Sequence, residues 1–419
     1  MPDADNPHPI PAAGRRPWQP AVWLVLLAAA GTFALTMGTR QSMGLFLGDL
    51  NTSTGLGIVS ISLAFAFGQL WWGLTQPFAG AVADRYGAAP VLLAGVLLVA
   101  LGTAITPLMT STAGLIFAIG VLSAGGAGMA GPSVLMAATT RLLPAAKRGL
   151  ATGIVNAGGS FGQFVTAPLA GLLIATMGWA GAMVSLGLLV LLALPAAFVL
   201  RGGVGAGGPA GATAQPERLP AREALRRAWA LPSYRLLTAG FFVCCFHVAF
   251  LATHLPGVVA QCGLPPAVAA WSIALLGLFN IFGSLAMGWA VSRWRMKSLL
   301  ALVYTARGVA VLLFLAAPKT EFVMLAFAAV MGATFLSTVP PTAGLVAKFF
   351  GPANMAMLFG VVMVSHQVGG FLGAWLGGQV YAATGSYDWV WYADVMLAFA
   401  AALIHLPIRE AALARPKAA

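Results

Sequence analysis

The sequence predicts an all-α membrane protein with twelve transmembrane helices, and three observations support this prediction. Of the 419 residues, 60% are apolar and only 8% are charged, whereas an average soluble domain carries roughly 25% charged residues. The mean hydropathy is +0.90. The apolar residues also gather in runs of about 20, the length at which an α-helix crosses a hydrocarbon core of about 30 Å. Soluble enzymes and disordered proteins are therefore excluded.

Charged residues and Gly/Pro clusters divide the chain into twelve apolar runs. A backbone inside lipid has to satisfy its own hydrogen bonds, so each run is predicted to form a helix and not a strand. The first run follows Arg15 and Arg16 and is interpreted as an uncleaved signal-anchor, because many more runs follow it. The predicted spans are 21–46, 55–82, 89–108, 112–139, 149–176, 180–200, 236–261, 266–291, 298–316, 321–346, 354–383 and 389–408.

The basic residues predict the orientation of these spans. If the N-terminus is cytoplasmic, 19 of the 22 Lys and Arg residues lie in cytoplasmic segments, while Lys319 lies in an outside loop and Arg40 and Arg307 lie within spans. Cytoplasmic loops of membrane proteins carry an excess of Lys and Arg. We therefore expect both termini in the cytoplasm, a multi-pass location in the cell inner (plasma) membrane with the lipid bilayer as partner, and no nucleic-acid partner despite the net charge of +12.

A Gly- and Pro-rich stretch at 202–234 separates two sets of six spans. Such a composition disfavours a buried element and is typical of a linker. Its basic end, 221–231, can form a short helix, for which lipid anchoring and a solvated tether are both open interpretations. The predicted domains are a cytosolic tail at 1–20, a six-helix bundle at 21–201, a cytosolic linker at 202–234, a second six-helix bundle at 235–409 and a cytosolic tail at 410–419.

The two halves of the sequence repeat each other. Gly80, near the end of span 2, corresponds to Gly288, near the end of span 8, at an offset of 208 residues. A parallel repeat implies two pseudo-symmetric six-helix bundles, related by an axis along the membrane normal, with a substrate path between them. At an offset of 207 residues, spans 5 and 11 carry matching glycines at nine-residue spacing, namely Gly153, Gly162 and Gly171 against Gly360, Gly369 and Gly378.

The residues at the end of span 2 resemble the signature of the major facilitator superfamily, G-x-x-x-D-R-x-G-R-K. Ala88 and Ala89 stand where the family usually has basic residues. Segments 147–153 (KRGLATG) and 40–46 (RQSMGLF) are similar to motifs of the monocarboxylate and oxalate/formate transporter group. The matching signature positions are Gly80, Asp84, Arg85 and Gly87.

The resemblance extends over all twelve spans and implies the major facilitator fold. It implies a secondary active transporter of a small organic anion, a monocarboxylate, that works by alternating access with proton coupling. One chain contains both bundles, so we expect a monomer. No Gly-rich phosphate loop, Ser/His/Asp set or zinc motif occurs in the sequence, so we expect neither an enzyme nor a cofactor.

The resemblance fails at two positions that matter for the substrate. Ser284 stands where the group has a functional arginine in span 8, and Val362 lies near the position of a lysine that the oxalate carriers have in span 11. Both cations that would pair with the substrate are missing. Oxalate itself is therefore disfavoured.

Arg40 is the candidate for pairing with a carboxylate. A charge in hydrocarbon costs at least about 2.5–3.5 kcal/mol, which makes an arginine within a span a functional candidate. Arg40 lies in the outer third of span 1, where snorkelling to the headgroups is the competing interpretation. Arg307 lies in the middle of span 9, a peripheral span in the superfamily, and is expected to have a structural or snorkelling role.

Three histidines are the candidate groups for proton coupling or anion pairing. His247 and His254 share one face of span 7, and His366 lies in span 11. Asp394 is placed beside the start of span 12, and no Asp or Glu is expected in the middle of a span. The competing interpretation is that each histidine is a hydrogen-bonded packing residue. The neutral candidates, for bonds to an anion or between helices, are Asn280, Ser284 and Gln367.

A gate is predicted at the cytoplasmic end of span 2. Asp84 is expected to cap the N-terminus of span 11, where the helix dipole is positive, and so to hold the inside closed. Arg85 and Arg141 are expected to join this contact. Gly80 would let spans 2 and 11 approach each other.

Two other transport functions remain open. The poorly charged cavity would also suit an efflux carrier for amphipathic compounds. A transition-metal carrier is the other alternative, although no tight ligand spacing such as C-x-x-C is present. Its soft or borderline ligands would be His247, His254, Cys244, Cys245, Met355, Met357 and Met363.

Overall fold

The computed structural model describes residues 20–142, 148–201, 220–351 and 355–410, and every regular element in these ranges is helical. Ten helical stretches of the described chain are long and apolar enough to cross a membrane. One of them, Thr152–Val199, has 48 residues and turns at Gly178, where φ is 73° and ψ is 167°. Glycine adopts such a positive φ without the steric cost that a Cβ brings. The predicted all-α membrane architecture is confirmed.

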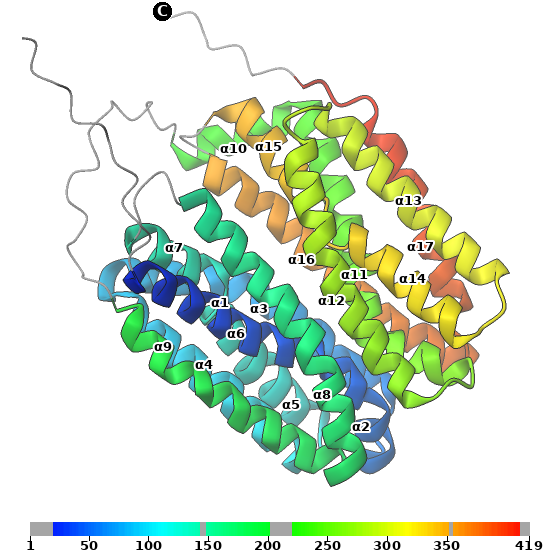
Figure 1. Ribbon diagram of the computed structural model, residues 1–419. Coiled ribbons are helices and arrows are strands. Elements are labelled where there is room, and N and C mark those ends of the chain that lie inside the picture. The colour runs from blue at the N-terminus through cyan, green and yellow to red at the C-terminus, as the bar shows by residue number, and fades with distance from the viewer. Residues whose placement is uncertain (1–19, 143–147, 202–219, 352–354, 411–419) are drawn as a thin grey trace, which may run out of the picture.

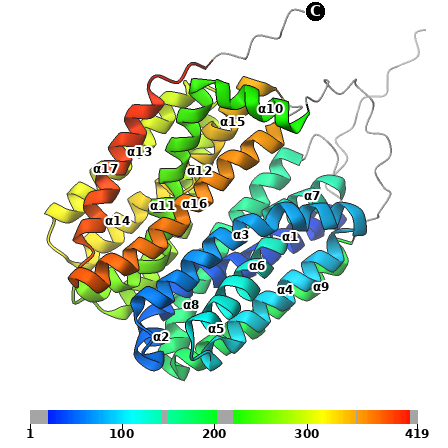
Figure 2. The same cartoon turned by 180° about the vertical axis from the view of Figure 1, so that it is seen from behind.

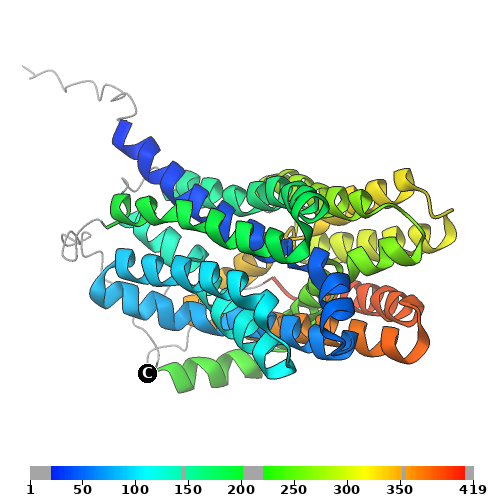
Figure 3. The same cartoon turned by 90° about the horizontal axis from the view of Figure 1, so that it is seen from below.

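Two helical bundles lie side by side (Figure 1), and the view from below separates the blue and cyan helices of the first from the yellow and red helices of the second (Figure 3). The first bundle is built around α1 (Pro20–Gln41), α3 (Ile58–Tyr86), α4 (Ala88–Ile105) and α8 (Arg148–Val190). The second is built around α11 (Pro232–Gln261), α12 (Pro266–Ala290), α13 (Met296–Ala316), α16 (Met355–Thr384) and α17 (Asp388–His405). Each bundle has its own buried apolar cluster.

Several spans differ from the continuous helices that the sequence predicts. The third ends in a 3₁₀ turn (η2, Thr106–Leu108), and the sixth is interrupted by another (η5, Leu191–Ala193) before α9 (Leu194–Val199). After α1, a 3₁₀ turn (η1, Met43–Phe46) and α2 (Leu47–Thr54) extend the first span beyond its predicted end at residue 46. The fourth span is divided into α5 (Thr112–Leu115), the π-helical η3 (Ile116–Ala124), α6 (Gly125–Met129) and α7 (Pro132–Leu142). The tenth is divided into α14 (Glu321–Thr334) and α15 (Val339–Phe350).

Prolines lie where the fourth and tenth spans divide. Proline has no backbone N–H and its ring clashes with the preceding helical turn, so it is favoured in the first turn of a helix and costs stability further inside. Pro77, Pro168 and Pro256 nevertheless lie inside α3, α8 and α11, so a proline alone does not divide a span. Pro132 begins α7, and Pro340 follows the first residue of α15. Four glycines between residues 125 and 131 further weaken the fourth span.

The two bundles are in close contact at the end of the molecule that holds α2 (Figure 2). A Cβ at Gly378 of α16 would collide with the Ser62 side chain of α3, and a Cβ at Gly171 of α8 would lie 3.0 Å from the Cβ of Ala270 in α12. The helices therefore approach at positions where one partner has no side chain.

Glycines toward the opposite end, which holds α7 and α15, have no such neighbours. A Cβ at Gly80, Gly153, Gly288 or Gly360 would meet no atom within 4 Å. The close approach of spans 2 and 11 that the sequence predicts at Gly80 is absent from this arrangement, so that prediction applies only to a state in which this end closes.

A short helix, α10 (Ala221–Ala230), precedes α11 and corresponds to the helix predicted at 221–231. Its Ala224 and Ala228 are buried, while Leu225 and Trp229 are exposed. Figure 2 shows α10 at the same end of the molecule as α15. The tails at 1–19 and 411–419 and most of the predicted linker, 202–219, lie outside the described residues.

A candidate binding site between the two halves

Arg40 lies at the junction of the two halves, in the last turn of α1. Its guanidinium donates hydrogen bonds to the side-chain oxygen of Gln69 on α3 and, at 3.4 Å, to that of Gln41. It also lies over the Trp72 ring, 4.7 Å from the ring centroid. In the described part of the chain Arg40 forms no ion pair with a carboxylate. Its partners are neutral, so its charge remains uncompensated.

Gln69 connects Arg40 to the other half. Its Nε2 donates to Oε1 of Gln367 on α16 at 3.2 Å and to Sγ of Cys245 on α11 at 3.2 Å. Gln367 in turn fills the space beside Gly73 of α3. The structure therefore brings Arg40 and Gln367, two of the predicted site residues, into one polar network across the interface.

Gln69 is a site residue that the sequence analysis missed. It is a polar side chain in the middle of the apolar second span, and such residues often mark substrate pathways. Neutral amides such as Asn280 and Gln367 are candidates in the sequence, but nothing in the pattern around Gln69 distinguishes it from other polar residues in spans. Its position opposite Arg40 depends on how α1 and α3 pack, which the sequence does not show.

A pocket opens beside this network. Its wall includes Arg40 and Gln69, the apolar side chains Phe65 and Ile119, and Thr253 of α11, so both halves line it. Arg40 is the one charged residue among the lining residues in the described chain. A cation with neutral hydrogen-bonding partners and apolar walls is suited to hold one anionic group with an apolar body.

None of the three candidate histidines is among the residues that line this pocket. His254 lies inside the second half, where its Nε2 is 2.7 Å from the Ala374 carbonyl and its Nδ1 is 3.3 Å from the Tyr387 hydroxyl. His366 packs on the Phe241 ring with a centroid distance of 4.5 Å.

His247 faces Asp394, away from the pocket. Its Nε2 lies 3.0 Å from the Asp394 carbonyl oxygen. The sequence places Asp394 beside the start of the last span and expects no Asp or Glu in the middle of one, but Asp394 lies almost two turns inside α17, which begins at Asp388, and is 1% exposed. The predicted span, 389–408, already contains Asp394, but the sequence does not show that its carboxylate is buried against His247 of α11.

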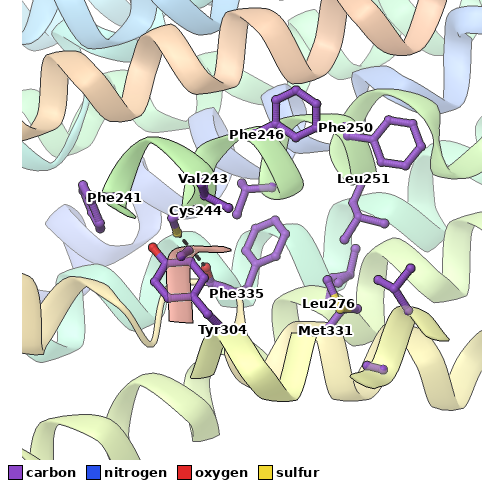
Figure 4. Packing of buried hydrophobic residues seen from close by; sticks show 14 of the residues in the cluster. Phe241, Val243, Cys244, Phe246, Phe250, Leu251, Leu276, Tyr304, Met331 and Phe335 are labelled. Carbon is purple, nitrogen blue, oxygen red and sulfur yellow. Dashed lines mark hydrogen bonds between the residues drawn. The ribbon is translucent and has the colours of Figure 1, made fainter. Parts of the chain in front are cut away.

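Arg307 is a second cation within a span and is buried, 1% exposed. Its guanidinium donates to the carbonyl oxygens of Thr334 and Phe335, the latter at 2.8 Å, where α14 ends. Cationic groups are stabilised at helix C-termini, where carbonyls lack intrahelical partners. Figure 4 shows Cys244 and Tyr304 beside Phe335 at this place. Arg307 therefore has a structural pairing, as expected, and it does not snorkel.

Asn280 and Ser284 join helices. Asn280 donates to Ser160 Oγ of α8 at 2.8 Å and accepts from the backbone N–H of Leu336, at the break between α14 and α15, at 3.0 Å. Ser284 donates to Asn280 at 3.2 Å. The side-chain groups of Asn280 and Ser284 that we expected to bind an anion are therefore already hydrogen-bonded within the protein.

The predicted gate is described only in part. Arg85 is exposed and lies over the Tyr86 ring at 5.2 Å. The side chains of Asp84 and Arg141 lie outside the described residues. The residues described contain no group of three or more His, Cys, Asp or Glu placed to hold a metal ion, which gives the metal-carrier alternative no support.

The chain is similar to known transporters. It is 29% identical to Monocarboxylate transporter 13 of Rattus norvegicus over 396 residues, which cover 92% of this chain and 89% of that protein. It is 25% identical to the Oxalate:formate antiporter of Oxalobacter formigenes over 259 residues, which cover 62% of this chain and 60% of that protein.

A solved structure has the same fold. A bacterial homologue of the human lysosomal transporter Spinster, in an inward-facing and unoccupied conformation, superposes with a TM-score of 0.76 at 16% identity, covering 93% of this chain and 97% of that one. The family match extends over residues 22–320 and 240–419. The relatives named above are transporters and not enzymes. Because the family match covers most of the chain, the chain belongs to the Major Facilitator Superfamily.

Proposed function

We propose that this protein is a secondary active transporter of a small organic anion, a monocarboxylate, and that Arg40 binds the carboxylate. The observation that carries the proposal is the uncompensated guanidinium of Arg40 at the interface of the two halves. Gln69 and Gln367 complete the polar side of the site. The apolar wall that includes Phe65 and Ile119 would hold the body of the anion.

A single cation favours a single negative charge. The pocket offers Arg40 and no second charged lining residue in the described chain, which supports a monocarboxylate over a dianion such as oxalate. The similarity to Monocarboxylate transporter 13 points the same way. We infer proton coupling because a monocarboxylate that moves with a proton carries no net charge, and because buried titratable groups lie in the second half.

The proposed topology has twelve spans in two pseudo-symmetric bundles. In it, α8 contributes two spans that meet at Gly178, and α17 forms the last. The proposed domains are the predicted bundles at 21–201 and 235–409, with the tails and the linker cytoplasmic. The matching glycines support the pseudo-symmetry, because the first of each set has no neighbour, the second packs within its own half and the third meets the other half.

Alternating access would be a rocking of the two bundles about Arg40. The basic residues support a cytoplasmic position for the α7, α10 and α15 end. The chain would work as a monomer in the plasma membrane. Because the bundles contact each other at the opposite end, this arrangement would be open to the inside. Asp84, Arg85 and Arg141 would form the cytoplasmic gate in the other state.

Uptake of labelled small monocarboxylates into proteoliposomes tests the proposal. Arg40→Gln should reduce uptake under an inward acid gradient at least about tenfold, because a charge-assisted hydrogen bond contributes roughly 1.5–3 kcal/mol. Arg293→Gln is the matched control, since Arg293 also lies over a tryptophan, Trp289 at 4.0 Å, but is exposed. Equal uptake by both variants would contradict the role of Arg40.

Efflux of amphipathic compounds is the second candidate, favoured by the apolar part of the pocket wall. The two functions differ in what stabilises the purified protein, because a ligand raises the melting temperature of the state that it binds. Monocarboxylates should raise it in the wild type and not in Arg40→Gln. Stabilisation by lipophilic cations alone would favour efflux.

A further inference from the structure

The second half contains a cluster of buried titratable side chains that the proposed anion site does not use. His247 on α11, Arg307 on α13 and Asp394 on α17 are 2%, 1% and 1% exposed. His247 Nε2 lies 3.4 Å from Asp394 Oδ1, and Arg307 contacts Cys244, three residues before His247 on α11. The pocket beside Arg40, in contrast, lies between the bundles. Charged groups within spans are costly and are often functional.

The cluster is only partly hydrogen-bonded. His247 Nε2 lies 3.0 Å from the Asp394 carbonyl oxygen and 3.4 Å from its Oδ1. Neither carboxylate oxygen of Asp394 receives a hydrogen bond, and His247 Nδ1 and Arg307 Nη1 have no hydrogen-bond partner. Buried polar groups are normally satisfied, so four such atoms in one cluster need an explanation.

The surroundings of Asp394 act on its charge in opposite directions. A buried carboxylate without donors is unfavourable, and the neutral carboxyl is much less so. A cation in the same part of the bundle favours the carboxylate, and Arg307 is placed there by its contact with Cys244, one helical turn from His247 on α11. These opposed influences suit a group that gains and loses a proton.

The other titratable groups around the cluster are few. Tyr304 comes from α13 and stacks on His405 of α17 at 5.2 Å. Cys244 of α11 lies 3.7 Å from Arg307 Nη2, and His366 of α16 lies next to Cys244. Asp394 is the one carboxylate among these groups in the described chain.

We propose that Asp394, with His247 beside it, is the proton-binding site of the transport cycle and is separate from the anion site. This inference rests on the proposed proton-coupled transport. The proton adds to a carboxylate oxygen of Asp394 and leaves from it to water. Helix α11 connects the two sites, because Cys245 contacts Gln69 of the anion site while the adjacent Cys244 contacts Arg307.

Infrared titration of the protein in lipid tests proton binding directly and needs no substrate. The wild type should show a protonated-carboxyl band that appears as the pH falls and is lost in Asp394→Asn. Asp388→Asn is the control, since Asp388 lies on the same helix but is exposed. This variant should lose only the carboxyl band of a water-exposed aspartate and should keep the band assigned to Asp394. A band unchanged in Asp394→Asn would overturn the proposal.

Transport separates the proton site from the anion site. Asp394→Asn should lose the stimulation of uptake by an inward acid gradient, while it retains exchange of labelled for unlabelled anion at equal pH on both sides. Stimulation that persists in Asp394→Asn would overturn the proposal. If the wild type moves no anion, the proposed function fails, and the infrared titration still decides whether Asp394 binds a proton.

A double variant distinguishes a proton site from a mere counter-ion of Arg307. Removing one of two buried charges destabilises a protein, and removing both does not leave a charge unpaired. Arg307→Gln combined with Asp394→Asn should fold even if Asp394→Asn does not, and it should remain insensitive to the acid gradient. Recovery of the gradient response in the double variant would show that Asp394 serves only to balance Arg307.

Discussion

Two arginines within spans, the half-buried Arg40 and the buried Arg307, have opposite surroundings. Arg307 is bonded to backbone carbonyls at the end of α14, which are permanent parts of the fold. Arg40 is bonded to two side-chain amides and faces a pocket. A carboxylate could replace the amide contacts of Arg40 without disturbing a helix, whereas replacing the contacts of Arg307 would expose the break in the tenth span. Ligand binding is therefore expected at Arg40.

At the same scale, His254→Ala should affect stability and not substrate affinity. The ring bonds to the Ala374 carbonyl and the Tyr387 hydroxyl and packs on Phe250, so its removal should cost about 2–4 kcal/mol. Gln69→Ala is the comparison and should raise KM with a smaller loss of stability. Melting temperature and KM of the two variants check this, and a raised KM at unchanged melting temperature in His254→Ala would place His254 in the binding site.

Individual residues could be predicted from the sequence only in part. The rarity of charge within spans selects Arg40, and it applies equally to Asp394, which lies five residues inside the predicted span 389–408 and whose burial the sequence does not show. Spacing does not show which way a side chain points, because that depends on which helices pack on each face. For this reason His254, two turns from His247 on the same helix, could not be recognised as a packing residue.

At the scale of elements, the three repeated glycines of α8 have three different surroundings. Gly162 of α8 lies against the backbone of Ala34 in α1, Gly171 meets the other half at Ala270, and Gly153 has no neighbour within 4 Å of a Cβ. The nine-residue spacing predicts that the glycines matter as a set. Which helix each one meets follows only from the packing.

Gly162→Ala should therefore destabilise the first bundle by about 1–3 kcal/mol or more, because the new Cβ would collide with the Ala34 carbonyl, which cannot turn aside. Gly153→Ala is the matched control on the same helix. It should be neutral or stabilising by up to about 1 kcal/mol, since alanine favours a helix over glycine. The melting temperatures of the two variants test this, and equal values would mean that α1 and α8 can separate at Gly162 without cost.

Most of the elements themselves were predictable. The apolar runs locate the helices within a few residues, because the thickness of the bilayer sets their length. The breaks in the fourth and tenth spans were missed, although Pro132 and Pro340 mark them. Hydropathy alone does not register a proline in an apolar run. The break in the tenth span also depends on Asn280 and Arg307, which satisfy its freed backbone groups from other helices.

At the scale of the whole molecule, the contacts between the halves correspond to one state of the proposed transport cycle. The bundles are closed at the α2 end, and glycines toward the α7 and α15 end have no partner helix. The repeat in the sequence predicts two bundles, but a repeat does not say at which end they touch. Both states of an alternating-access cycle use the same sequence, so only the packing distinguishes them.

Cross-linking across the interface should reveal this state. Gly171→Cys with Ala270→Cys should form a disulfide, because the two Cβ atoms would start 3.0 Å apart and a small separation of α8 and α12 gives the roughly 3.5–4.5 Å that a disulfide needs. Gly80→Cys with Gly360→Cys should not, since a Cβ at either position has no atom within 4 Å. Oxidation of the first pair should stop anion uptake by holding the α2 end closed, and reduction should restore it. Each single-cysteine variant controls for the native Cys244, Cys245 and Cys262. If instead the second pair cross-links readily and the first does not, the resting protein in the membrane is open at the α2 end.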